Sequence, residues 1–141
     1  MYLFDTDVLS NIVKTKPSPL LLEKLTKLPP DLQFSTAISV GEIYYGALRS
    51  AQGERILKAF EEKVFPQLTI LAFDEESAKT YGKIKVRMEK RGLSASEPDL
   101  RIASIAVQHK ITVITGNTKH FGNIPGVTCE NWINPAKLSS D

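Results

Sequence analysis

The stretch that decides the fold class is MYLFDTDVLS, residues 1–10. Tyr2 to Phe4 form a short apolar run that ends at Asp5, and apolar residues then recur at Leu9, Ile12 and Val13. A continuous run is typical of a buried strand, whereas the later spacing is typical of one face of a helix. The segment therefore predicts a strand that leads directly into a helix, with Asp5 at the junction.

The same alternation continues along the chain. Strands are predicted at about residues 33–36, 68–71 and 111–115, and helices at about 20–28, 39–49, 53–64, 74–91 and from 96 to 107. Strands that alternate with helices favour a parallel sheet covered on both faces. We therefore expect an α/β domain with three layers, helices on each side of a mainly parallel sheet of four or five strands.

Length and composition restrict the class of protein. A chain of 141 residues is of the usual size for one domain, and we expect residues 1–141 to form a single domain, with about 133–141 a mobile tail. There is no run of about 18 apolar residues and no basic segment before the first apolar run, so we expect a cytoplasmic protein without a membrane role. The net charge of +2 does not indicate a partner.

Few side chains could bind a soft metal ion. Cys129 is the only cysteine, which excludes an internal disulfide, and the histidines are His109 and His120. Any metal ion would therefore be bound through oxygen atoms.

Four polar residues stand at the ends of predicted elements. Asp5 and Asn117 follow strands directly, Glu42 is predicted in the first turn after the second strand, and Asp99 lies at a helix start. Ligands of parallel α/β sheets collect beyond the carboxyl ends of the strands, and carboxylate oxygens suit a hard divalent cation. Each acid could instead cap a helix, because Ser39 and Glu42 have capping-box spacing and acids stabilise first turns. Only their convergence would make a metal site.

Four segments together resemble the PIN-domain family, and more narrowly its VapC-type toxins. These are residues 1–10, SVGEIYYG at 39–46, DLRIA at 99–103, and VITGNTKHF at 113–121. The resemblance covers nearly the whole chain. Two positions depart from the family pattern: Asp7 stands where Asn is more usual, and Asn117 stands where many members have a fourth acid.

The resemblance implies a metal-dependent endoribonuclease of the PIN fold. Mg²⁺ or Mn²⁺ would activate a water that attacks the phosphate in line, giving 5′-phosphate and 3′-hydroxyl ends. Asp5, Asp99 and Glu42 would bind the metal, with Asn117 a weaker and indirect ligand. Thr6 and Thr115 would support these ligands from behind.

The resemblance also implies partners. The substrate would be RNA, a small antitoxin protein would bind the chain, and the toxin would form a homodimer. The leucine-rich segment at residues 20–28 offers apolar side chains for either protein contact.

Two other functions are compatible with part of the sequence. Asp5-Thr6-Asp7-Val8 also resembles the nucleophile motif of haloacid-dehalogenase-type phosphatases, with Asp5 as nucleophile and Asp7 as acid or base. Only 26 residues follow Thr115, and the sole Asp among them is Asp141, so the later acidic pair of such enzymes has no place. The neutral Asn117 also leaves open a non-catalytic domain that binds RNA or protein.

Overall fold

A computed structural model describes residues 1–134 of the chain, and its sheet has five parallel strands in the order β3-β2-β1-β4-β5. The strands are β1 (Tyr2–Phe4), β2 (Gln33–Thr36), β3 (Thr69–Leu71), β4 (Thr112–Ile114) and β5 (Cys129–Glu130). All four pairings are parallel, and Phe4 lies opposite Ile114 in the pairing of β1 with β4. The predicted α/β class and the strand number are confirmed.

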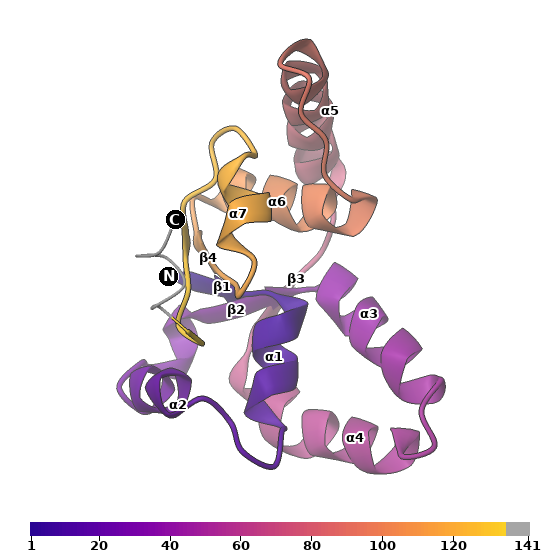
Figure 1. The fold of residues 1–141 in the computed structure, drawn as a ribbon, viewed down its shortest axis with the longest axis vertical. Coiled ribbons are helices and arrows are strands. Elements are labelled where there is room, and N and C mark those ends of the chain that lie inside the picture. The colour runs from indigo at the N-terminus through magenta and orange to yellow at the C-terminus, as the bar shows by residue number, and fades with distance from the viewer. Residues whose placement is uncertain (135–141) are drawn as a thin grey trace.

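Helices cover both faces of this sheet (Figure 1). One side carries α1 (Thr6–Ile12), α2 (Pro19–Thr26), α3 (Ala37–Leu48) and α4 (Gly53–Ala59), which continues as a π-helix over Phe60–Val64. The other side carries α5 (Glu75–Lys90), α6 (Glu97–His109) and the short α7 (Thr118–Gly122). The predicted three-layer arrangement is therefore confirmed.

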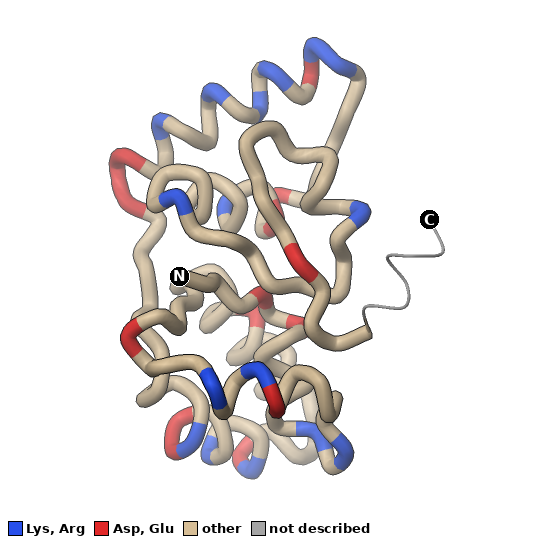
Figure 2. The backbone as a smooth tube through the Cα atoms, turned by 90° about the vertical axis from the view of Figure 1, so that its left-hand side faces the viewer, with Lys and Arg blue, Asp and Glu red and all other residues tan. Residues whose placement is uncertain are grey.

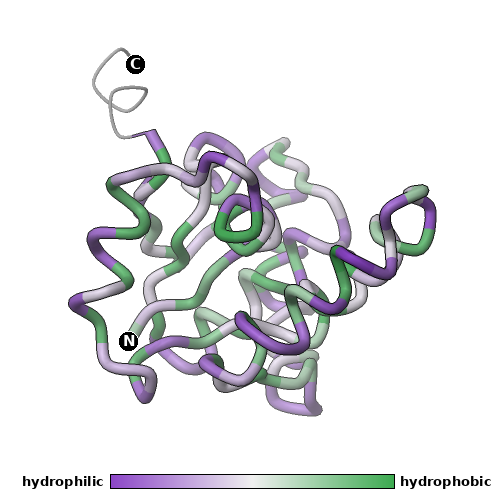
Figure 3. The backbone as a smooth tube through the Cα atoms, turned by 90° about the horizontal axis from the view of Figure 1, so that it is seen from below, coloured by the Kyte–Doolittle hydropathy of each residue, from purple (hydrophilic) through white to green (hydrophobic). Residues whose placement is uncertain are grey.

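The core lies in two clusters because successive strand residues point to opposite faces. In β1, Leu3 packs in the cluster with α5 and α6, whereas Phe4 packs in the cluster with α1 to α4. Val113 and Ile114 divide in the same way in β4. Figure 3 shows hydrophobic segments running through the middle of the molecule along the strands. A strand buried on both faces must be apolar throughout, which explains the continuous run at residues 2–4.

The start of α3 differs from the sequence prediction. The N-cap is Thr36, whose hydroxyl accepts a hydrogen bond from Ser39 N at 3.1 Å, and the helix begins at Ala37. The predicted capping box of Ser39 with Glu42 is wrong, because the helix starts three residues earlier than the pattern indicated. Glu42 consequently lies in the second turn, where its carboxylate has no role in capping.

The end of the described chain packs against its beginning. Trp132 is 5% exposed and its ring lies 4.9 Å from that of Tyr2 and 5.9 Å from that of Phe4, measured between centroids. Ile133 follows Trp132, and its backbone oxygen accepts a hydrogen bond from Ser18 Oγ, which holds Ile133 in place. The remainder of the expected tail, residues 135–141, lies outside the described residues.

The leucines of α2 mostly face the core. Leu21 is completely buried and Leu25 and Leu28 pack against the same cluster, while Leu22 is exposed. Most of the apolar surface that the sequence suggested for protein contacts is therefore already covered by the fold. No helix in residues 1–134 is both long enough and apolar enough to cross a membrane.

The turn between α3 and α4 requires glycine at position 53. A Cβ on Gly53 would collide with the backbone oxygen of Ala47, which cannot move without disrupting the end of α3. We expect Gly53→Ala to lower the free energy of unfolding by about 1–3 kcal/mol, the usual cost of overpacking. Urea denaturation followed by circular dichroism measures this.

Gly82→Ala is the matched control, because a Cβ there meets nothing within 4 Å and the residue lies inside α5. That variant should gain about 0.5–1 kcal/mol from helix propensity. Equal effects of the two substitutions would contradict the proposed collision.

Candidate functional site

Asp5 is the centre of the candidate site. It follows β1, caps α1 and is only 5% exposed. Its Oδ1 accepts a hydrogen bond from Thr6 N at 2.7 Å, and its Oδ2 accepts one from Thr115 Oγ1 at 2.9 Å. Thr115 lies next to Asp5 because β4 pairs with β1. The pairing extends past the strand ends, since Asp5 N donates a hydrogen bond to Ile114 O at 2.9 Å. The predicted supporting residue Thr115 therefore fixes both the position and the orientation of this carboxylate.

The environment of Asp5 disfavours its negative charge. The pKa of the Asp5 carboxyl is raised from 3.8 to about 7, mainly by burial and also by the charges of Asp7 and Asp99. The hydrogen bonds from Thr6 and Thr115 lower this pKa but do not offset the rise. A group that titrates near neutrality in a polar cluster is a candidate for metal binding or catalysis. A bound cation would reverse this effect by stabilising the ionised form.

Glu42 joins the site through Thr6. Thr6 Oγ1 donates to Glu42 Oε1 at 2.7 Å and lies 3.0 Å from Ser39 Oγ. This connects the first turn of α1 with the second turn of α3, so residues from the first and second strand–helix units meet. Thr6 therefore holds the Glu42 carboxylate, and its role in supporting a metal ligand stays a prediction.

Asp99 and Asn117 are placed less tightly. Asp99 lies in the first turn of α6, where Ser96 provides the cap by accepting a hydrogen bond from Asp99 N at 3.3 Å. The Asp99 carboxylate is thus not needed for capping, and it is near enough to raise the pKa of Asp5. Asn117 donates its backbone N–H to Thr115 Oγ1 at 3.0 Å, while its side chain makes no capping bond to α7.

The sequence prediction did not include Asp7 among the site residues. Its Oδ2 accepts a hydrogen bond from Gly116 N at 2.9 Å, and its Oδ1 is a buried side-chain oxygen without a hydrogen-bond partner in residues 1–134. The signal that could have identified it is a second acid two residues after Asp5.

The donor atoms fit a hard divalent cation by chemistry and charge. Asp5, Glu42, Asp7 and Asp99 supply only oxygen ligands. The charges of Asp7 and Asp99 both disfavour the negative charge of Asp5. Within residues 1–134, no three Asp, Glu, His or Cys side chains already stand in an arrangement that could hold a metal ion. Binding would therefore require movement of these side chains.

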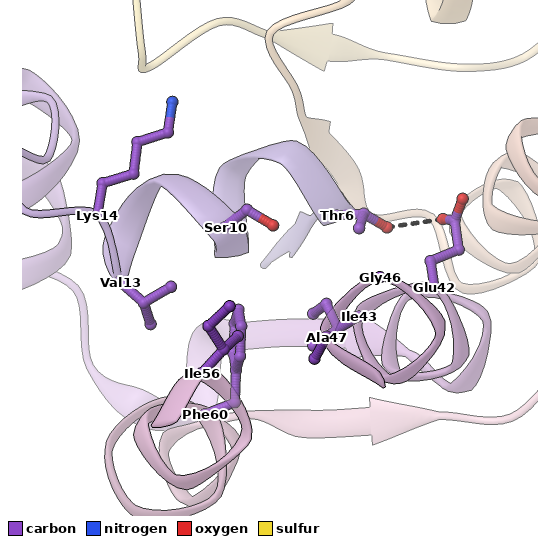
Figure 4. Close-up of a pocket in the computed structure, with 10 residues that line it drawn as sticks. All are labelled: Thr6, Ser10, Val13, Lys14, Glu42, Ile43, Gly46, Ala47, Ile56 and Phe60. Atoms are coloured by element: carbon purple, nitrogen blue, oxygen red, sulfur yellow. Dashed lines mark hydrogen bonds between the residues drawn. The ribbon is translucent and has the colours of Figure 1, made fainter. Parts of the chain in front are cut away.

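A cavity of about 340 Å³ opens beside this site (Figure 4). Thr6 and Glu42 lie at one end, Lys14 at the other, and apolar side chains of α3 and α4 line its floor, including Ile43, Ile56 and Phe60. Figure 2 shows a row of basic positions along α5 and further basic positions on the helices at the opposite end.

A comparison with protein families identifies the fold. A profile described as the PIN domain matches residues 2–127. This chain belongs to the PIN-domain family. The matched residues include Asp5, Glu42, Asp99 and Asn117, so the whole candidate site lies within the domain. The match is to the PIN domain over most of the chain, which gives no support to the phosphatase alternative.

Relatives of this PIN domain are similar over almost their full length. "Ribonuclease VapC2" of Haemophilus influenzae is 29% identical over 134 residues, which cover 94% of this chain and 98% of the relative. "tRNA(fMet)-specific endonuclease VapC" of Salmonella typhimurium is 28% identical over 131 residues, covering 93% and 97%. The crystal structure of VapBC2 from Rickettsia felis bound to a promoter DNA fragment contains a chain with 26% identity and a TM-score of 0.85, covering 93% and 98%.

Proposed function

We propose that this PIN domain is a metal-dependent endoribonuclease, using Mg²⁺ or Mn²⁺, and that it acts as the toxin of a toxin–antitoxin pair. The observation that carries the proposal is the buried Asp5 at the carboxyl end of the central strand, whose pKa is raised by burial and by the charges of Asp7 and Asp99. Such repulsion is costly in a metal-free fold and is relieved by a divalent cation. The ribonuclease names of the relatives specify the substrate class.

Each residue has a distinct task in this proposal. Asp5, Asp99 and Glu42 bind the metal ion, which when bound lowers the pKa of a water and stabilises charge on the phosphate. Thr115 and Thr6 orient Asp5 and Glu42 through the hydrogen bonds described above. Asn117 contributes a neutral oxygen and, through its backbone, keeps Thr115 in place. Water attack on the phosphate would leave 5′-phosphate and 3′-hydroxyl ends.

An antitoxin is the proposed protein partner, since solved relatives include toxin–antitoxin complexes. Its side chains would occupy the cavity next to Glu42, where apolar lining adjoins an acid that a cationic side chain could pair with. Tyr45 and Leu48, 65% and 72% exposed, extend the apolar surface along α3 and suit a contact with an antitoxin or a second copy. The toxin would act in the cytoplasm, where its RNA substrates are.

The metal dependence gives a direct test. Cleavage of a mixed RNA substrate should require added Mg²⁺ or Mn²⁺, stop with EDTA, and resume when the metal is restored. Asp99→Asn should lower the cleavage rate by at least 100-fold, because one carboxylate ligand is lost while Ser96 still caps α6. The product ends are identified by two reactions. A 3′-hydroxyl end is accepted by an RNA ligase, and a 5′-phosphate end is not labelled by a polynucleotide kinase until the phosphate is removed.

Asp31→Asn is the matched control, because Asp31 is exposed in the short 3-10 helix (Pro30–Leu32) that precedes the start of β2, whereas the predicted ligands lie beyond the carboxyl ends of the strands. It should cleave RNA like the parent. If the parent protein cuts no RNA with either metal, or if Asp99→Asn cuts as fast as Asp31→Asn, then a non-catalytic binding domain is the better conclusion.

A further inference from the structure

The loop after β4 brings the neutral residue Asn117 to the site, next to Thr115, which binds Asp5. Asn117 carries no charge, so this side of the site lacks an acid of its own. The loop instead holds an acid from another element. Gly116 precedes Asn117, and its backbone N–H donates a hydrogen bond of 2.9 Å to Oδ2 of Asp7, which lies in the first turn of α1.

Asp7 lies close against the backbone of Gly116. A Cβ on Gly116 would stand 2.7 Å from Asp7 Oδ2, so only glycine leaves room for the carboxylate there. The hydrogen bond and the missing Cβ together fix one oxygen of Asp7 against the backbone that follows β4. Asp7 therefore has a defined position at the strand end, in contrast with a surface acid.

The second oxygen of Asp7 has no partner. Oδ1 is buried, yet it makes no hydrogen bond within residues 1–134. A buried acceptor that is left unsatisfied costs stability, more so when it carries charge. A simple helix-dipole role for Asp7 would not explain this burial, because an acid in a first turn obtains that benefit while facing water.

Asp5 and Asp7 are held by adjacent residues of the chain. Thr115 Oγ1 donates a hydrogen bond to Asp5 Oδ2, and Gly116 N donates one to Asp7 Oδ2. Asp5 is buried and Asp7 is partly buried, and each has one oxygen held by a residue that follows β4. A cation would stabilise two carboxylates held in this way.

We propose that Asp7 is a fourth acid of the metal site, supplied from α1, and that it takes the place of a charge at Asn117. Oδ2 remains on Gly116 N, and Oδ1 faces the cation directly or through a water. The inference rests on the proposed metal site, but it concerns metal affinity and can be tested without any RNA.

Asp7→Asn is the decisive variant, because the amide oxygen can still accept the hydrogen bond from Gly116 N while the charge is removed. Titration calorimetry with Mn²⁺ should show an affinity at least about 10-fold weaker than that of the parent chain, the scale seen when outer ligands of metal sites are changed. The metal-induced rise in melting temperature should shrink in parallel. Asp31→Asn controls for the loss of one negative charge.

Three outcomes separate the possibilities. Weaker Mn²⁺ binding in Asp7→Asn but not in Asp31→Asn supports the proposal. Unchanged binding in Asp7→Asn, together with weaker binding in Asp7→Ala, would overturn it, because Asp7 would then only hold the loop at Gly116. If the parent binds Mn²⁺ through Asp7 but cuts no RNA, the nuclease proposal fails while this inference stands.

Discussion

Asp5→Asn is expected to abolish RNA cleavage, by at least 1,000-fold, and at the same time to stabilise the metal-free protein at neutral pH. Activity is lost because Asp5 is the best-positioned proposed ligand, with both oxygens oriented by hydrogen bonds. Stability is gained because Asn keeps the bond from Thr6 N but carries no charge. Active-site residues that are suited to function at the expense of stability commonly behave in this way.

The pH dependence of this gain follows from the pKa of Asp5. Because the folded-state pKa is raised, from 3.8 to about 7, the native protein binds more protons than the unfolded chain between these values. The free energy of unfolding therefore falls as the pH rises from about 4 to about 7, by up to about 4 kcal/mol at 1.36 kcal/mol for each pKa unit. The difference between Asp5→Asn and the parent should be small near pH 4 and largest above pH 7.

Urea denaturation in EDTA at pH 4.5 and pH 8 measures the two differences. Added Mg²⁺ should stabilise the parent by mass action and leave Asp5→Asn nearly unaffected. A variant that is less stable than the parent at pH 8, without metal, would show that the charge of Asp5 is not penalised in the fold. In that case the main argument for a cation at this position is lost.

Trp132→Ala should cause the largest loss of stability among the variants considered, about 3–5 kcal/mol. The ring is 5% exposed, packs on Tyr2 and Phe4, and carries Lys24 Nζ 5.1 Å from its centroid. Truncation of a buried aromatic residue leaves a cavity as well as removing apolar contacts. It also detaches the last described segment from β1, the central strand that leads to Asp5.

Circular dichroism during urea denaturation gives the loss for Trp132→Ala. Trp132→Phe is the conservative comparison and should lose less, because most of the aromatic contact with Tyr2 and Phe4 is retained. Cleavage per folded molecule should change little in both variants. A normal unfolding midpoint with weakened RNA cleavage would instead mean that Trp132 contacts RNA, which its burial argues against.

The positions of the elements could be predicted because periodicity is a local property. The apolar run at residues 2–4, the helical spacing after it and the strand at residues 111–115 all match observed elements. Asp5 and Asn117 were identified by the same reasoning, since a polar residue directly after a buried parallel strand must lie at the carboxyl edge of the sheet. That these positions act as metal ligands stays a prediction.

The role of Glu42 could not be predicted in this way. The spacing of Ser39 and Glu42 is compatible with a capping box, and only the tertiary structure shows that Thr36 caps α3 and that Glu42 bonds to Thr6. The choice between two caps three residues apart depends on where β2 ends, and that is set by its pairing with β1 and β3.

By itself, the sequence determined the α/β class, the order of the elements and the acid at the end of the first strand, because each depends on neighbours along the chain. The tertiary structure alone decided which of the other acids meet Asp5, and it added Asp7, whose partner Gly116 is 109 residues away. It also placed Trp132 in the core. Contacts of this kind depend on strand order and helix packing, which no local pattern encodes.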